Sequence, residues 1–232
     1  MAELLHLDDP KVTVALRRSA QAKRLTLTVP QNGDAPRVTA PPGVSLADIR
    51  MFLMRQSDWL SAAIDRAPDA IIVSPGAVIP VEGRMLRIVH QSGPRRPPVI
   101  NEGELVLSGA AASAKTVQVW LRERARAEVT AIATDCATKL GAKVGRVTMR
   151  DTKGQWGACT GRGDLSFSWR LAMAPPSVLD YVAAHEAAHL LEMNHGPKFW
   201  ALVERLRPHW RNERNWLRQH GGGLHRYRFS AE

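Results

Sequence analysis

Three histidines and one glutamate lie close together in the sequence, in the pattern His185-Glu186-x-x-His189 followed by His195. Two histidines four positions apart on a helix lie on the same face, one turn apart. Both imidazoles can therefore bind one zinc ion, at roughly 2.0–2.1 Å. Glu186 lies on another part of the helix surface, so it is better placed to contact a water at the metal than the metal itself. The pattern predicts a zinc site with a general base beside it.

A third metal ligand must approach from outside the helix, and His195 is the leading candidate. The segment Asn194-His195-Gly196-Pro197 is typical of a helix end, because Asn and Gly tolerate left-handed backbone and Pro interrupts the helix. A chain reversal there can bring His195 back to the metal. Glu192 competes with it, but Glu192 lies two turns along the helix from His185, which makes it a poor third ligand.

The helix that carries this motif is expected over residues 177–193. Pro175-Pro176 suits its start, because proline fits the first turn of a helix and lacks a donor that would be unpaired there. No proline or glycine interrupts residues 177–193. We therefore expect His185 and His189 to lie on one regular helix.

The composition indicates an ordinary globular chain. Its 232 residues can bury the core of one large domain or two small ones, and no apolar run is long enough to span a bilayer. The first nine residues carry acids where a signal peptide has bases. Cys136 and Cys159 form no disulfide framework, and they lack the C-x-x-C spacing of paired metal ligands. We expect a cytoplasmic protein without a membrane segment.

The net charge of +10 is uneven along the sequence. Residues 197–232 hold eight Lys/Arg against three Asp/Glu, together with Trp200, Trp210 and Trp216. Basic and aromatic side chains together can bind nucleic acid. The alternative, which we favour, is a solvated helical surface with tryptophans packed beneath it.

Periodicity predicts the other elements. Strands are expected at 12–18, 24–29 and 37–40, followed by a helix over 46–66 with Ser45 as its N-cap. A long helix is expected over 114–140, with a buried stripe that includes Cys136, and it ends before Gly141. The remaining expected strands are 78–81, 85–89, 98–100, 105–107, 144–151, 155–159 and 165–169, and the remaining expected helices are 197–207 and 212–219.

These elements predict an α+β fold: a β-rich N-terminal region followed by a zincin-like domain with a long helix, a small antiparallel sheet and the metal helix. The expected boundary separates residues 1–110, which carry one helix, from a catalytic domain over residues 111–232. Gly221-Gly222-Gly223 is expected to begin a flexible tail.

Several segments together resemble the YgjP-like metallopeptidase family, a group near the SprT-like and gluzincin-like zinc peptidases. The likeness covers most of the chain. The segments that carry it are the N-terminal R-R-S-x-x-A-K-R-L, Gln155-Trp156-Gly157-Ala158-Cys159, Trp169-Arg170-Leu171, Ala174-Pro175-Pro176, Leu179-Asp180-Tyr181-Val182, His185-Glu186-x-x-His189, Asn194-His195-Gly196-Pro197-x-Phe199-Trp200, and the stretch from Trp210 to Trp216.

This resemblance implies a zinc bound by His185, His189 and His195, with Glu186 catalytic. The sequence departs from the family pattern at three positions on the strands before the metal helix. Gln155 stands where the family usually has Arg, Ala158 where it has Ser, and Ser168 where it has Asn. Substrate recognition can therefore differ from that of relatives, while the metal motif is intact.

The leading hypothesis is a metallopeptidase that holds one zinc per chain, although a histidine-rich site also binds other divalent ions. A metal-activated water attacks the peptide carbonyl and Glu186 acts as the general base. Trp156, Ala158, Trp169 and Arg170 are candidates for contact with a peptide or protein substrate. The oxyanion partner stays open among Arg170, Tyr181 and His209.

Two alternatives use the basic charge. In the first, the metal serves a nucleoside triphosphate pyrophosphatase, and Arg17, Arg18, Lys23 and Arg24 contact the phosphates. Against it, the chain has no glycine-rich phosphate loop and lacks the carboxylate ligands that magnesium prefers. In the second, the chain is a SprT-like protease associated with nucleic acid, an inference by analogy.

Overall fold

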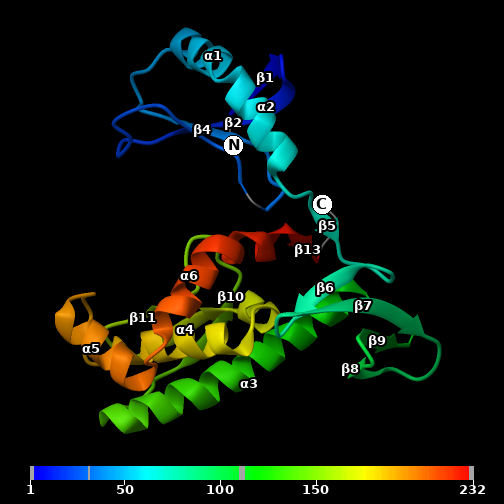
Figure 1. The fold of residues 1–232 in the computed structure, drawn as a ribbon, viewed down its shortest axis with the longest axis vertical. Helices are drawn as coiled ribbons and strands as arrows, with labels where there is room; N and C mark the ends of the chain where they lie inside the picture. Colours follow the sequence, from blue (N-terminus) through cyan, green and yellow to red (C-terminus); the bar gives the residue numbers. More distant parts are fainter. Residues whose placement is uncertain (1–2, 31, 110–112, 230–232) are drawn as a thin grey trace. The chain divides into compact units, whose positions relative to one another are not determined.

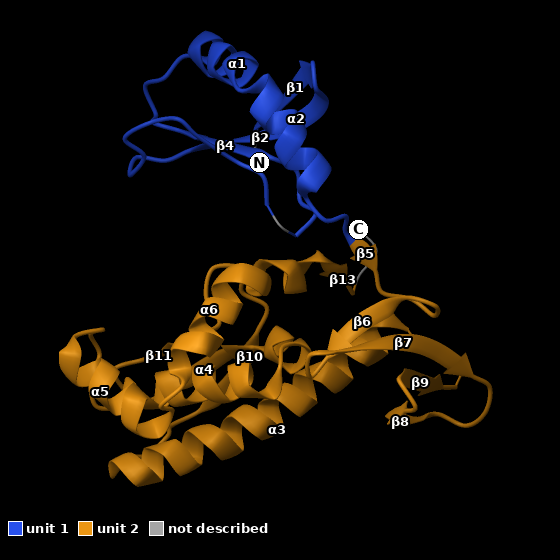
Figure 2. Cartoon of the chain, viewed as in Figure 1, with its two compact units in different colours: residues 1–70 blue, residues 71–232 orange. Residues whose placement is uncertain are grey.

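A computed structural model describes residues 3–30, 32–109 and 113–229, and it has the mixed α+β content that the sequence predicts. The chain forms two compact units, Met1–Ala70 and Ile71–Glu232 (Figure 2). The expected boundary at residue 110 falls inside the second of these units. Among the described helices, none combines the length and apolar character that a membrane span requires.

The first unit packs two helices on one mixed sheet. Strands β1 (Glu3–Asp8), β2 (Lys11–Arg18), β3 (Thr26–Thr28) and β4 (Arg37–Ala40) lie in the order β1-β2-β4-β3. Ser45 caps α1 (Leu46–Arg55) as predicted, because its hydroxyl accepts from the Asp48 N–H at 3.1 Å. The single helix expected over 46–66 is interrupted: the Gln56 N–H bonds back to Leu53 in a tighter turn, and α2 (Ser57–Arg66) follows. Strand β1 was not predicted.

The second unit begins with the two-residue strand β5 (Ile71–Ile72) and a four-stranded sheet. This sheet contains β6 (Val78–Val81), β7 (Arg84–Gln91), β8 (Arg96–Asn101) and β9 (Glu104–Ser108) in the order β6-β7-β9-β8. Leu105 and Leu107 of β9 share one buried core with Val117 and Leu121 of the helix that follows. This shared core explains why the compact unit extends across residue 110.

The long helix α3 (Ala114–Leu140) has the predicted bounds and supports the rest of the unit (Figure 1). Its stripe of small and aliphatic side chains is buried, and Cys136 lies within it. Gly141 ends the helix with φ of 71°, a left-handed conformation that glycine adopts without strain. Helix α4 (Pro176–Ala188) packs along α3 and carries the histidine motif.

A small sheet of three strands packs on α4. Strands β10 (Val147–Arg150), β11 (Gly157–Cys159) and β12 (Leu165–Ser168) lie in the order β10-β12-β11. β12 pairs parallel with β10 and antiparallel with β11, so the sheet is mixed, whereas we expected an antiparallel one. β11 therefore forms an edge of this sheet, and the chain after β12 enters a short 3-10 helix, η1 (Trp169–Met173).

The prediction of a flexible tail from Gly221 onward was wrong, because the described residues there form regular elements. Helices α5 (Pro197–Leu206) and α6 (Trp210–His220) are followed by a 3-10 helix, η2 (Gly221–Arg226), and by strand β13 (Tyr227–Arg228), which pairs with β5. The buried Arg170 guanidinium donates to the carbonyls of Leu224 at 2.8 Å and Tyr227 at 3.1 Å, and it pairs with Asp151 at 2.7 Å. These bonds order the segment despite its three glycines.

Replacing Arg170 with Met should therefore destabilise the protein strongly. The variant leaves the buried carbonyls of Leu224 and Tyr227 and the partly exposed Asp151 carboxylate without their donor, and each buried acceptor left unpaired costs about 1–3 kcal/mol. Urea unfolding measures this change. In the control Lys139→Met, which removes the exposed pair with Asp135, the change should stay under about 0.5 kcal/mol. Equal effects of the two variants would contradict the anchoring role.

Candidate metal centre

The histidine motif lies at the C-terminal end of α4, which is shorter than predicted. The α-helix ends at Ala188, with His189 as its C-cap, although no proline or glycine stands at residues 177–193. The next residues form tighter turns: the Leu190 N–H bonds to Ala187 at 3.1 Å, and the Leu191 N–H bonds to Ala188 at 3.1 Å. This early end lets the chain turn back before α5, so that His195 reaches the motif.

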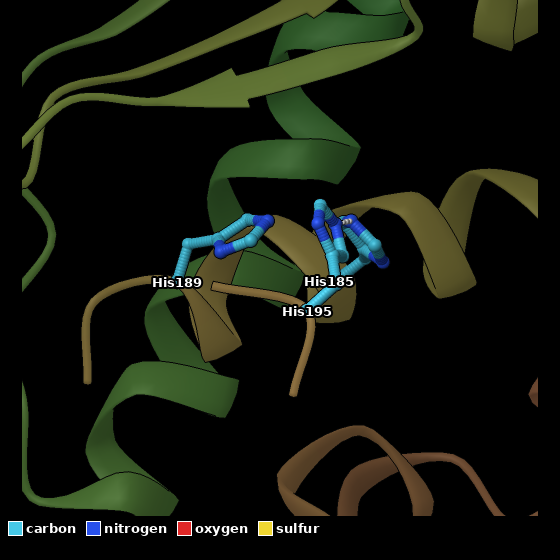
Figure 3. A group of neighbouring side chains, drawn as sticks. All are labelled: His185, His189 and His195. Carbon is cyan, nitrogen blue, oxygen red and sulfur yellow. Dashed lines mark hydrogen bonds between the residues drawn. The ribbon is translucent and has the colours of Figure 1, made fainter. Parts of the chain in front are cut away.

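The three histidines form one cluster (Figure 3). One ring nitrogen from each of His185, His189 and His195 lies within 4.8 Å of the others. The Nε2 atoms of His185 and His195 are 3.1 Å apart. Such spacing suits three ligands of one ion, because imidazole nitrogens bind zinc at about 2.0–2.1 Å.

Hydrogen bonds orient two of these rings through the nitrogen that faces away from the cluster. The Nδ1 of His189 lies 2.9 Å from the backbone carbonyl of Glu192, and the Nδ1 of His185 lies 3.5 Å from the Tyr181 hydroxyl. Metal-binding histidines commonly make such a second bond, which fixes the ring and its tautomer. The Nε2 atoms of His185 and His189 thus remain for an ion.

Burial keeps these imidazoles in the form that binds metals. The pKa of His185 is lowered to about 3, mainly by desolvation, and the charges of His189, His195 and Arg214 contribute to this shift in the same direction. Burial also lowers the pKa of His189, although its bond to the Glu192 carbonyl opposes this shift. Neutral imidazole is the ligand form, so a borderline divalent ion such as zinc fits this donor set.

Aromatic rings hold the histidines in place. The Phe199 ring centroid lies 4.8 Å from that of His185, 4.4 Å from that of His189 and 4.7 Å from that of His195. Trp200 lies 5.8 Å from His195 and stacks on Trp210 at 4.3 Å. Both Phe199 and Trp200 come from the first turn of α5, so this helix forms one wall of the cluster. Both residues belong to a segment that resembles the family, but the sequence did not indicate that they contact the histidines.

Glu186 is buried beside the cluster, with only 5% of its surface exposed. Its side chain lies against Gly157 of β11, since a Cβ added there would be 2.5 Å from the Glu186 Cγ and Oε1 atoms. Burial raises the pKa of Glu186 to about 8. Only a residue without a side chain fits at position 157 while Glu186 keeps this conformation.

The other candidate ligands lie outside the cluster, which contains only histidines among the described residues. Glu192 contributes its backbone carbonyl to His189 instead of its carboxylate. Cys136 is fully buried in a separate small core, and the Cys159 thiol contacts the Thr160 carbonyl at 3.4 Å. Burial raises the pKa of both thiols, which disfavours the thiolate that would bind a metal.

The four proposed substrate residues divide into two pairs. Trp169 is 1% exposed, with its ring against Phe229, and Arg170 is engaged by Asp151 and the C-terminal segment, so neither side chain is presented to a substrate. Trp156 and Ala158 are half-buried on or next to β11, the strand that contacts Glu186 through Gly157. Of the proposed oxyanion partners, Tyr181 faces the cluster, and the exposed His209 precedes α6.

A cluster of three imidazoles beside a buried carboxylate is a donor set typical of a metal-dependent hydrolase. The family model of the YgjP-like metallopeptidase domain matches residues 23–220, and the chain belongs to this family. Membership implies a metal ion and a protein or peptide substrate. A search of curated proteins and a search of solved structures found no match to the chain.

Replacing Gly157 with Ala should disturb Glu186 without removing a metal ligand. The new methyl group would overlap the Glu186 side chain, and overpacking of this kind costs about 1–3 kcal/mol. Urea unfolding, with elemental analysis of zinc, measures both effects. Gly154→Ala is the matched control, because nothing lies within 4 Å of the Cβ there. A Gly157→Ala variant as stable as this control would contradict the contact.

Removing the third histidine tests the cluster as a metal site. Elemental mass spectrometry of the purified chain should find about one zinc ion, and His195→Ala should lose most of it because two imidazoles bind zinc weakly. The control is His209→Ala, which removes an exposed histidine outside the cluster. Zinc retained in both variants would exclude His195 as a ligand.

Proposed function

We propose that this chain is a zinc-dependent peptidase in which His185, His189 and His195 hold the metal and Glu186 is the general base. The observation that carries the proposal is the arrangement of the three imidazoles and the buried Glu186 carboxylate beside the edge strand β11. Membership of the metallopeptidase family supports the reaction class.

In this mechanism His185, His189 and His195 would hold a zinc ion, which would supply Lewis-acid chemistry for the peptide carbonyl and the attacking water. Glu186 takes the proton from the attacking water and later gives it to the leaving amine. The contact with Gly157 holds the carboxylate in one position. The Tyr181 hydroxyl orients His185 through its Nδ1 atom.

The edge strand β11 offers a template for an extended peptide. Ser168 N–H bonds to the Trp156 carbonyl and Thr160 N–H bonds to the Asp164 carbonyl, both at 2.9 Å. Because bonded pairs alternate along an antiparallel ladder, Ala158 is the next bonded partner of β12. The N–H and C=O groups of Gly157 and Cys159 therefore face the open edge, and these groups can pair with a substrate.

Replacing Glu186 with Gln should preserve zinc and abolish most peptide hydrolysis. The amide cannot accept the proton, and loss of a general base reduces turnover by on the order of 10²–10⁴-fold. A mixture of fluorogenic peptides and elemental analysis measure both properties. Glu192→Gln is the matched control, since this carboxylate lies on the same segment and only its backbone carbonyl contacts His189. An active Glu186→Gln variant would disprove this mechanism.

The edge-strand template predicts different effects for proline at two neighbouring positions of β11. Ala158→Pro removes an N–H that pairs with β12 and should lower stability. Cys159→Pro removes an N–H that faces the open edge, so it should weaken peptide binding while zinc is retained. Titration of zinc-loaded Glu186→Gln with a peptide, with and without each proline substitution, measures the change in peptide affinity. Equal peptide affinity with and without Cys159→Pro would exclude the template.

The phosphohydrolase alternative stays a prediction, with one observation in its favour. Arg17, Lys23 and Arg24 line a single surface hollow in the first unit. Arg18, in contrast, donates to the backbone carbonyls of Pro42 and Val44, at 3.0 and 2.8 Å. Pyrophosphate release from a panel of nucleoside triphosphates separates this alternative from a peptidase. The nucleic-acid alternative stays untested too, and steep salt dependence of DNA or RNA binding would support it.

A further inference from the structure

An arginine that the sequence did not single out lies beside the metal cluster. The guanidinium carbon of Arg214, on α6, is 5.1 Å from the ring centroid of Trp200 and 5.8 Å from that of Trp210. These two rings stack at 4.3 Å and an angle of 17°. A guanidinium on such a face is attracted by the rings, and its N–H edge stays free to bind an anion.

Arg214 differs from two neighbouring arginines in its ion pairs, although the Arg211 guanidinium carbon also lies over Trp210, 4.6 Å from that ring centroid. Arg207 forms an ion pair with Asp180, and Arg211 forms one with Glu204 at 2.9 Å. Within residues 3–30, 32–109 and 113–229, no carboxylate lies at ion-pair distance from Arg214, and its side chain is exposed. Arg214 therefore has its donors available for a partner from outside the described chain.

The position of Arg214 sets how far from the metal such a partner would lie. The Trp200 ring is 5.1 Å from the Arg214 guanidinium carbon and 5.8 Å from the His195 ring, so these two groups are at most about 11 Å apart. An extended chain spans about 3.3–3.6 Å per residue. A group bound by Arg214 thus lies only a few residues from a peptide bond at the histidine cluster.

We propose that Arg214, held on the stacked rings of Trp200 and Trp210, forms a carboxylate subsite beside the metal cluster and selects peptides with a negative charge a few residues from the scissile bond. This inference rests on the proposed peptidase function. The guanidinium fork matches a carboxylate with two parallel hydrogen bonds, which are stronger than bonds between neutral groups. The carboxylate can be the C-terminus of the peptide or an Asp or Glu side chain.

Three peptide hydroxamates with the same apolar backbone test the subsite, because the hydroxamate binds zinc without being cleaved. The first ends in a free carboxylate, the second has an amidated end and a Glu side chain, and the third has an amidated end and Gln. Each is titrated calorimetrically into the full chain, after elemental analysis has verified the zinc content. The chains are the wild type, Arg214→Gln and Arg211→Gln, and the last is the matched control because its exposed arginine already pairs with Glu204.

In the wild type, at least one carboxylate probe should bind about tenfold or more tightly than the neutral probe, as expected for a charge-assisted bidentate pair. This ratio should fall to near one in Arg214→Gln and persist in Arg211→Gln. The probe that shows the preference identifies the source of the carboxylate. A preference that survives Arg214→Gln, or that Arg211→Gln abolishes equally, would overturn the proposal.

Two further outcomes separate this proposal from the proposed function. Absence of any preference in the wild type, or of hydroxamate binding to the zinc-loaded chain, would also overturn the carboxylate subsite. If the preference depends on Arg214 but no peptide is hydrolysed, the subsite stands and the peptidase proposal fails. An equal fall in turnover of charged and neutral peptides in Arg214→Gln, without a change in the hydroxamate ratio, would instead assign Arg214 to the reacting oxyanion and contradict substrate selection.

Discussion

Close packing between α3 and α4 determines where the side chains of the histidine cluster lie. Ala184 and Ala187 of α4 are fully buried with Cys136 of α3, and such small side chains let two helices approach closely (Figure 1). One face of α4 is thus fixed in the core, and the histidines lie on another. The sheet of β10, β11 and β12 and the helix α5 pack against α4 and complete the site.

The sequence predicted the parts of the site that depend on local patterns. The bounds of α3 follow from its apolar period and Gly141, and the pairing of His185 with His189 follows from helical geometry. The early end of α4 has no local signal, because it depends on the turn that places Glu192 against His189. The three glycines after His220 suggested disorder, but bonds from Arg170, far away in sequence, override that local preference.

The two arginines Arg170 and Arg214 show why residue type alone does not reveal a role. Arg170 belongs to a segment that resembles the family, yet its guanidinium is buried under the C-terminal segment and satisfied by Asp151 and two carbonyls. Arg214 also lies in a segment that resembles the family, and no role was predicted for it from the sequence, yet it lies exposed on two stacked tryptophans next to the histidines. Burial and partners, which are properties of the folded chain, separate a structural cation from one that is free to bind.

The contact between Gly157 and Glu186 also limits how this sequence can evolve. Any larger residue at position 157 meets the Glu186 side chain, although the backbone conformation there would accept one. A descendant that lost glycine at 157 would therefore have to lose or reposition the glutamate, whereas position 186 could change while glycine stays. A side chain at this position of β11 would thus mark a chain in which the buried carboxylate has moved or been replaced.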